Sequence, residues 1–358
     1  MNPVDTLTDT SSAHTPDDVA QLVAAGRNRE AIDSLLRQGE HEADPALERA
    51  LVDLLLQTAP RPGAAGDIPQ REAHRPPLVF REGAIPEVPA DAFSVPLLRE
   101  ALDRSGHLIV RGFFKPEDVL PLRTCIDASL RSRVEAETNG SLDEDNPWYY
   151  PSPHFPGNHH AFHMLHPGRK HKLTGSIRVI DSPRGTRSVL QLYRSYAIKQ
   201  LLEEYFEESA VLATRKWVFR LATPRRLGTG IGGGWHQDGQ FMGADVRALN
   251  IWAPLSQCGH GTPAPGITLL PRRIDRLLES GTRGANLDWV VGGELVAELS
   301  REARVVNPFF DVGDALFFDH FSLHRSGYIR GQNADRYALE SWFYAGSAVE
   351  ENATVELP

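Results

Sequence analysis

The sequence predicts a mostly β protein with flanking helices and an N-terminal helical appendage. Three observations favour this fold class. Residues 248–255 and 336–343 have the apolar and alternating patterns of strands, and residues 312–318 read as a glycine–aspartate turn that feeds an apolar strand. Residues 1–58, by contrast, place leucines at helical spacing. With 358 residues, 41% of them hydrophobic, the chain can bury one large core and a smaller appendage.

Three amphipathic helices are expected before the β region. Their patterns cover residues 17–26, 28–38 and 44–57. A stretch rich in Pro and Gly, residues 59–78, follows and reads as a linker. The predicted organisation is therefore a helical segment at 1–58, this linker, and a β domain at 79–358. The helices either pack on the β domain or form a docking element for a partner or a second subunit, and the sequence leaves both open.

The motif that carries chemistry is His236-Gln237-Asp238. Residues i and i+2 of a strand point to the same face, so His236 and Asp238 can hold one metal ion. The third ligand, His324, would come from a strand that is adjacent in space and distant in sequence, as in a double-stranded β-helix. Two histidines and one carboxylate on one side of iron(II) leave the other side open for a chelating co-substrate and dioxygen.

Taken alone, the His-x-Asp spacing is weak evidence, because the chain contains 14 histidines and 47 acidic residues. A solvated strand end would explain the tripeptide equally well. The apolar strands that follow it, and the placement of His324 directly after one of them, favour the metal site.

Three stretches, taken in order, resemble the phytanoyl-CoA dioxygenase family of iron(II)/2-oxoglutarate oxygenases. They are residues 105–118, residues 235–238, and residues 313–327 with an arginine about twelve residues after the histidine. The similar region spans roughly residues 90–345, most of the chain. This resemblance implies a jelly-roll, cupin-like core.

The resemblance also implies roles for individual residues. The implied iron(II) ligands are His236, Asp238 and His324. The implied contacts of 2-oxoglutarate are Arg336, Ser326 and Trp252. A guanidinium suits the distal carboxylate because it is always charged and binds a carboxylate through two parallel hydrogen bonds. An ordinary core aromatic is the alternative for Trp252. No further side chain is required as an acid or nucleophile, so none is assigned as catalytic.

Two of these assignments have rivals. His320 lies four residues before His324, but only His324 is followed by the family's Ser and Gly. Arg330 competes with Arg336, although its loop, residues 328–333, favours a solvated charge. Residues 259–273 depart from the family pattern, so substrate contacts of relatives do not carry over there.

The implied activity is hydroxylation of an unactivated C–H bond in a small-molecule metabolite or natural product. Dioxygen and 2-oxoglutarate are consumed, and succinate and carbon dioxide are released. Related halogenases lack the carboxylate that Asp238 supplies, so oxygen insertion is favoured. The alternatives are a cupin-like metalloenzyme that does not use 2-oxoglutarate, and a non-catalytic sensor of iron and 2-oxoglutarate. Nothing in the sequence selects the substrate or separates hydroxylation from desaturation or cyclisation.

The composition narrows the classes further. A formal net charge of −9 argues against a nucleic-acid surface, which requires a clustered basic face. The two cysteines, Cys125 and Cys258, make no disulfide framework and fit a reducing cytoplasm. The first residues lack the basic start and apolar run of a signal peptide, and no apolar stretch is long enough to span a bilayer.

Two further features bear on the substrate. Residues 148–172 hold six of the histidines and read as a lid, with Trp148, Tyr149 and Tyr150 near substrate, or alternatively as a second metal site. Several basic residues bracket the metal motif: Arg215, Lys216, Arg220, Arg225, Arg226, Arg272 and Arg273. An anionic substrate would explain these charges, and a solvated surface explains them equally well.

Overall fold

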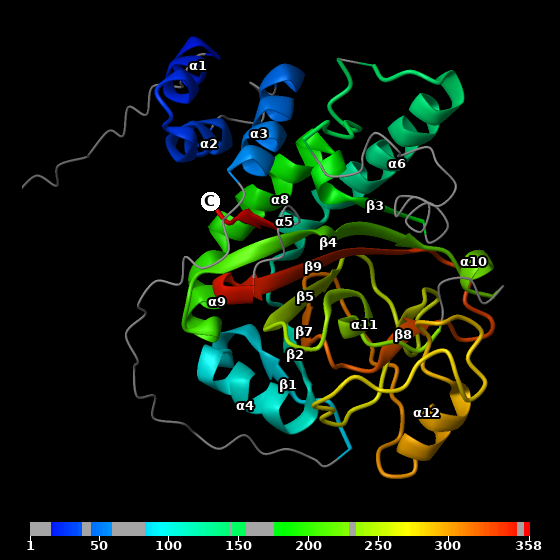
Figure 1. Ribbon diagram of the computed structural model, residues 1–358. Coiled ribbons are helices and arrows are strands. Elements are labelled where there is room, and N and C mark those ends of the chain that lie inside the picture. Colours follow the sequence, from blue (N-terminus) through cyan, green and yellow to red (C-terminus); the bar gives the residue numbers. More distant parts are fainter. Residues whose placement is uncertain are drawn as a thin grey trace, which may run out of the picture.

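A mixed sheet of eight strands forms the frame of the molecule, with helices on one face and a two-stranded sheet on the other (Figure 1). This computed structural model describes residues 16–37, 44–58, 83–143, 145–154, 175–228, 234–348 and 354–358. Within those residues a sheet with flanking helices is confirmed, but the expectation of a mostly β chain is wrong, because the described helices together contain more residues than the described strands. The jelly-roll topology remains a prediction.

The large sheet has the strand order β1-β2-β7-β5-β9-β4-β10, with β3 paired to β4. Its strands are β1 (Glu87–Pro89), β2 (His107–Arg111), β3 (Ser176–Arg178), β4 (Ala210–Ala222), β5 (Ala248–Pro254), β7 (Ala315–Asp319), β9 (Arg336–Ala345) and β10 (Thr354–Glu356). The β1–β2 pair is parallel, and the other described pairs of this sheet are antiparallel. The small sheet pairs β6 (Gly266–Leu269) with β8 (His324–Gly327).

Alternation along the central strands gives the large sheet two apolar faces. On β5, Leu249 and Ile251 pack into the core under the helices, whereas Trp252 packs into the core shared with the small sheet. On β7, Phe317 and Phe318 divide in the same way. The strands predicted around residues 248–255, 312–318 and 336–343 are therefore confirmed as β5, β7 and β9.

The helical face is covered by α4 (Val95–Ser105), α6 (Pro121–Asn139), α8 (Pro183–Ser195) and α9 (Ile198–Phe206). Local sequence sets the bounds of α4. Ser94 caps its start by accepting a hydrogen bond from the Leu97 amide, and Gly106 ends it with a φ of 79° before β2 begins. Short helices complete the described fold: α5 (Pro116–Val119), α10 (Pro224–Gly228), α11 (Gly239–Met242) and α12 (Gly293–Leu299).

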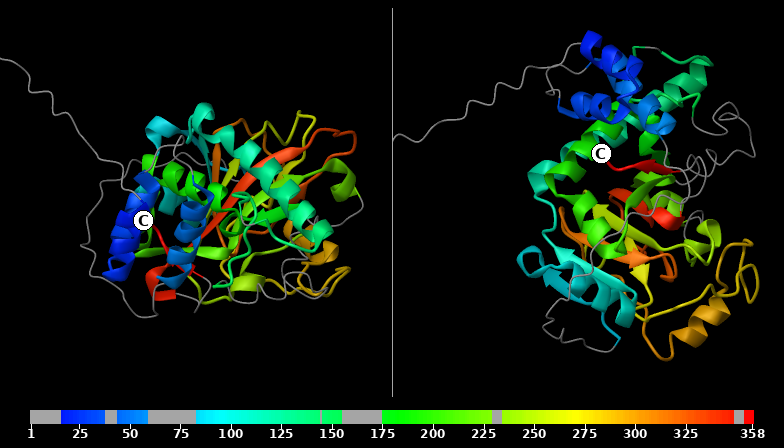
Figure 2. Two further views of the ribbon diagram at one scale, coloured as in Figure 1. Left: turned by 90° about the horizontal axis from the view of Figure 1, so that it is seen from above. Right: turned by 60° about the vertical axis from the view of Figure 1, so that its left-hand side comes forward.

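The three predicted N-terminal helices are present as α1 (Pro16–Ala24), α2 (Asn28–Arg37) and α3 (Pro45–Gln57). They lie against the helical layer, with α3 beside α8 (Figures 1 and 2). Leu51 and Leu55 of α3 are buried in the same core as the residues of α8. The helices thus pack on the β domain, and a role for them in docking a partner or a second subunit stays a prediction. The predicted linker at 59–78 lies outside the described residues.

Each described helix is too short or too polar to cross a bilayer.

Candidate metal centre

His236 and His324 lie directly opposite each other on neighbouring extended segments. Each backbone amide donates to the carbonyl of the other, at 2.9 and 3.0 Å. His324 begins β8 and pairs with Leu269 of β6 on its other side, so the His236 segment extends the small sheet. The two imidazole ring centroids are 4.3 Å apart. The structure therefore brings together two histidines that are far apart in the sequence.

Asp238 reaches the same point by a different local structure from the one expected. The sequence analysis placed His236 and Asp238 on one strand, and this detail is wrong. His236 forms an isolated bridge, and Asp238 has helical dihedral angles (φ −66°, ψ −22°) as the residue before α11. Tertiary contacts impose the turn, because the Gly239 amide donates to the His320 carbonyl at 2.9 Å.

Gln237, between the two candidate ligands, fixes the position of the motif through side-chain hydrogen bonds. Its side chain is fully buried and donates to the carbonyls of Phe321 and Arg276, at 2.7 and 3.0 Å. Its amide oxygen accepts from the Leu278 amide at 2.6 Å. These bonds hold the backbone of the motif against two distant loops.

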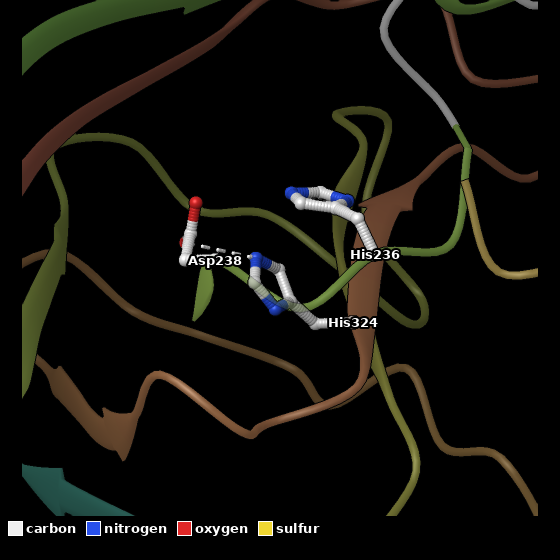
Figure 3. A group of neighbouring side chains, drawn as sticks. All are labelled: His236, Asp238 and His324. Atoms are coloured by element: carbon white, nitrogen blue, oxygen red, sulfur yellow. Dashed lines mark ion pairs between the residues drawn. The ribbon is translucent and has the colours of Figure 1, made fainter. Parts of the chain in front are cut away.

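His236, Asp238 and His324 form one compact cluster (Figure 3), with one potential ligand atom from each lying within 4.8 Å of the others. Each histidine Nδ1 lies close to a backbone carbonyl: 2.9 Å from Gly234 for His236, and 3.1 Å from Ser322 for His324. An Nδ1–H donor to these carbonyls leaves Nε2 with its lone pair free. This arrangement is the one that metal-ligating histidines adopt.

Asp238 is buried, and its two oxygens have different surroundings. Oδ1 accepts from the ammonium of Lys216 at 2.8 Å. Oδ2 has no hydrogen-bond partner among the described residues and lies 3.7 Å from Nε2 of His324. Burial alone would raise the pKa of this carboxyl, but the nearby Lys216 charge and the two imidazoles outweigh it and hold the pKa well below its usual range. Asp238 therefore carries a negative charge with one oxygen available.

His236 is neutral over the ordinary pH range. Burial lowers its pKa from 6.5 to about 3, with a further lowering from the adjacent His324. A neutral imidazole is the form that binds a metal ion. The cluster thus combines two imidazole donors with one ionised carboxylate, a donor set that suits a first-row transition metal.

The three residues expected at 2-oxoglutarate surround one corner between the two sheets. Arg336 begins β9, is buried, and donates from Nη1 to the Gly266 carbonyl of β6. Its guanidinium carbon lies 5.6 Å from the ring centre of Trp252 on β5. Ser326 lies opposite Ile267 in the β6–β8 pair, two residues beyond His324 and thus on the same side of the strand.

Arg336 is a buried cation without a carboxylate partner among the described residues, and its Nε has no hydrogen-bond acceptor there. Burial lowers its pKa from 12.5 to about 10, so it stays charged at neutral pH. An unpaired buried charge is costly unless a ligand neutralises it. The geometry therefore suits an anionic ligand at this corner.

The two sequence rivals lie elsewhere. His320 follows β7 in a turn, where its Nε2 contacts the Ala244 carbonyl at 3.2 Å, and it is not a member of the cluster. Arg330 is exposed in its loop. Of each pair of rivals, His324 is the histidine in the cluster and Arg336 is the buried arginine.

Sequence reasoning missed three neighbours of the cluster. The ring centroids of Trp289 and Phe241 lie 5.6 and 6.4 Å from that of His236. Lys216 was noted only as one of several basic residues. A register shift in β4 between Leu212 and Trp217 marks the irregular segment that carries it to Asp238. No local pattern in the sequence marks any of these contacts.

Trp148, Tyr149 and Tyr150, which the sequence analysis expects near substrate, lie on the helical side of the large sheet, and their proximity to substrate stays a prediction. Tyr149 is buried in the core under the helices, and the Tyr150 hydroxyl donates to Asp53 of α3 at 3.0 Å. The Trp148 ring packs against that core and faces the guanidinium of Arg184, 5.2 Å from its centroid. In the histidine-rich stretch, residues 155–174 lie outside the described residues, so the lid and the second metal site stay predictions.

The basic residues that bracket the motif are largely neutralised. Ion pairs join Lys216 to Asp238, Arg220 to Glu340, Arg272 to Glu302 and Arg273 to Asp319. These four charges are therefore not available as a free cationic surface for an anionic substrate.

No family model and no curated protein matches the chain. Several solved structures are similar at low identity. AviO1 from Streptomyces viridochromogenes Tue57 shares 15% identity with a TM-score of 0.38, over 70% of this chain and 95% of that one. SnoN, a non-haem α-ketoglutarate-dependent epimerase from nogalamycin biosynthesis, shares 15% with a TM-score of 0.41, over 70% and 83%. EctD from S. alaskensis, with 2-oxoglutarate and 5-hydroxyectoine, shares 17% with a TM-score of 0.42, over 70% and 75%.

Proposed function

We propose that the protein is an iron(II)- and 2-oxoglutarate-dependent dioxygenase that hydroxylates an unactivated C–H bond of a small molecule. The observation that carries the proposal is the cluster of His236, Asp238 and His324, in which one carboxylate oxygen has no hydrogen-bond partner among the described residues. A double-stranded β-helix core and membership of the phytanoyl-CoA dioxygenase family are part of the same proposal. The order of the sequence motifs supports both.

The donor set fits the metal. Two imidazoles and one carboxylate from a single side satisfy the facial arrangement of iron(II) oxygenases. Buried polar atoms are rarely left unpaired, so Asp238 Oδ2 is accounted for when it binds a cation. Iron(II) and 2-oxoglutarate supply the dioxygen chemistry when bound, with succinate and carbon dioxide as the co-products.

The protein's own residues bind and orient. The backbone carbonyls of Gly234 and Ser322 fix the two histidine rings, and Lys216 fixes the carboxylate. Arg336 and Ser326 would hold the distal carboxylate of the co-substrate, beside the wall that Trp252 would form. The buried guanidinium of Arg336 makes a stronger pair there than it would in water.

Succinate formation tests the proposal. Aerobic protein with iron(II) and 2-oxoglutarate should release succinate slowly even without its substrate. His236→Ala and Asp238→Ala should release none above the protein-free background while retaining their far-ultraviolet circular dichroism. Equal succinate release by the wild type and both variants would refute the metal assignment. Metal binding without any 2-oxoglutarate turnover would favour the cupin-like alternative.

A further inference from the structure

Asn250 and Trp342 form a buried polar pair with no partners. They lie opposite each other in the register of β5 and β9, and both are fully buried. Neither amide atom of Asn250 nor the indole Nε1 of Trp342 has a hydrogen-bond partner among the described residues. Because buried polar groups are nearly always paired in folded proteins, such a pair marks a place where a ligand supplies the missing bonds.

This pair faces the metal cluster. Leu249 and Ile251, its neighbours on β5, point to the helical face, so Asn250 points toward the small sheet. On the other side Asn250 lies opposite Phe318 of β7. The Phe318 ring centroid is 5.5 Å from Trp342 and 5.0 Å from His324. A single aromatic ring thus links the pair to a candidate metal ligand.

The rise along β5 from Trp252 to Asn250 matches the length of 2-oxoglutarate, the proposed co-substrate. Asn250 and Trp252 are successive residues on the inward face, and two residues of antiparallel strand rise about 6.8 Å. Arg336 lies over Trp252, at the far end of that step. A five-carbon dicarboxylate whose distal end binds Arg336 would bring its other end to the level of Asn250.

We propose that Asn250 and Trp342 form a subsite for the metal-proximal carboxylate of a 2-oxo acid. The indole N–H and the Asn250 amide N–H donate to the carboxylate oxygens, which pairs two of the three orphaned atoms. Hydrogen bonds to a charged group are stronger than neutral ones. The unpaired polar atoms destabilise the ligand-free protein, and this free energy is recovered as binding affinity when the carboxylate pairs with them. This inference rests on the proposed function.

Asn250→Leu tests the subsite by two independent readouts. The change removes both orphaned amide atoms at similar volume, so the metal-free protein should unfold at a higher temperature than the wild type. Its dissociation constant for 2-oxoglutarate, measured by anaerobic titration of the iron(II) protein, should rise roughly 10- to 100-fold. Trp342→Phe, which removes only the indole N–H, should weaken binding less.

Pyruvate identifies which carboxylate is bound, because it has the 2-oxo-acid end but no distal carboxylate. Asn250→Leu should weaken both pyruvate and 2-oxoglutarate, whereas Arg336→Ala should weaken 2-oxoglutarate alone. Thr354→Val is the matched control. It removes another buried orphaned hydroxyl, on the edge strand β10, and should leave both affinities unchanged.

Each outcome decides the inference. Unchanged 2-oxoglutarate affinity in Asn250→Leu and Trp342→Phe, with a normal wild type, would overturn the subsite and leave the proposed function intact. A lowered unfolding temperature without loss of affinity would show that Asn250 binds an internal water instead. A wild type that binds iron(II) but not 2-oxoglutarate would overturn the proposed function and the subsite with it.

Discussion

Both histidines of the cluster are held by the same local device. In each, Nδ1 lies within hydrogen-bond distance of the carbonyl two residues earlier in the chain, Gly234 for His236 and Ser322 for His324. The Ser322 hydroxyl lies 2.6 Å from Nε2 of the fully buried His107 on β2. The ring orientation of His324 is thus tied to a strand more than 200 residues earlier.

Lys216 stabilises the metal-free cluster by pairing with Asp238. Lys216→Met should therefore lower the free energy of unfolding of the metal-free protein by about 1–3 kcal/mol, since it leaves a buried carboxylate unpaired. Added manganese(II) or iron(II) should stabilise this variant more than the wild type, because the metal then supplies the missing cation. Thermal unfolding with and without metal measures both effects.

Lys199→Met is the control for that prediction. Lys199 donates to the Leu357 carbonyl at 2.8 Å and does not contact the cluster. It should lose some stability without a change in the metal-induced shift. A smaller metal-induced shift in Lys216→Met than in the wild type would contradict the role given to Lys216.

At the scale of elements, a buried ion pair fastens the N-terminal helices. Glu48 of α3 is buried and pairs with Arg184 at 3.0 Å and Arg187 at 3.7 Å, both on α8. Glu48→Ala should cost about 3–5 kcal/mol of unfolding free energy, because it removes the buried carboxylate that pairs with the buried guanidinium of Arg187. Denaturant unfolding checks the value.

An exposed pair in the same region provides the comparison. Arg27 and Glu30 are more than half exposed, so Glu30→Ala should lower the free energy of unfolding far less than Glu48→Ala does. Similar losses in Glu48→Ala and Glu30→Ala would mean that α3 is not fastened through its buried charge.

The sequence predicted the elements that local patterns encode. The apolar patterns in β5, β7 and β9 and the leucine spacing in α3 depend only on neighbouring residues. The bounds predicted from them lie within a few residues of the observed ones. The helical turn at Asp238 is set by distant hydrogen bonds, so local spacing predicted a strand there instead.

The candidate ligands were predictable because histidine and aspartate are recognisable as metal ligands from the residue type alone. Contacts made across the fold were not: the pairing of Lys216 with Asp238 depends on an irregularity in β4, and the Asn250–Trp342 pair depends on strand register. The packing of Trp148 against the core under the helices was not predictable either, because an aromatic beside a glycine- and proline-rich stretch resembles a binding loop.

For the whole molecule, two histidines with lowered pKa values make stability depend on pH: His107 is fully buried and His236 is partly buried. Burial lowers the pKa of both His107 and His236 from 6.5 to about 3. Between these values the unfolded chain binds protons that the folded protein does not. Stability is therefore complete above pH 6.5 and falls toward pH 3, by about 1.4 kcal/mol per pH unit for each histidine.

Denaturant unfolding of the metal-free protein at pH 7.5, 6 and 5 measures that slope. His107→Gln should reduce the slope by about one histidine's share, since glutamine does not titrate. A stability that is unchanged between pH 7.5 and 5 would contradict the lowered pKa values of these two histidines.

The most direct test of the account is an anaerobic titration of the iron(II) protein with 2-oxoglutarate, followed by the visible metal-to-ligand charge-transfer band. We expect a saturable band in the wild type and none in His236→Ala. Arg336→Ala should need roughly 10- to 100-fold more 2-oxoglutarate, because a charge-assisted pair is lost, and Arg330→Ala should titrate as the wild type does. A wild type that binds iron without developing the band, or an Arg336→Ala variant with unchanged affinity, would contradict the proposed site.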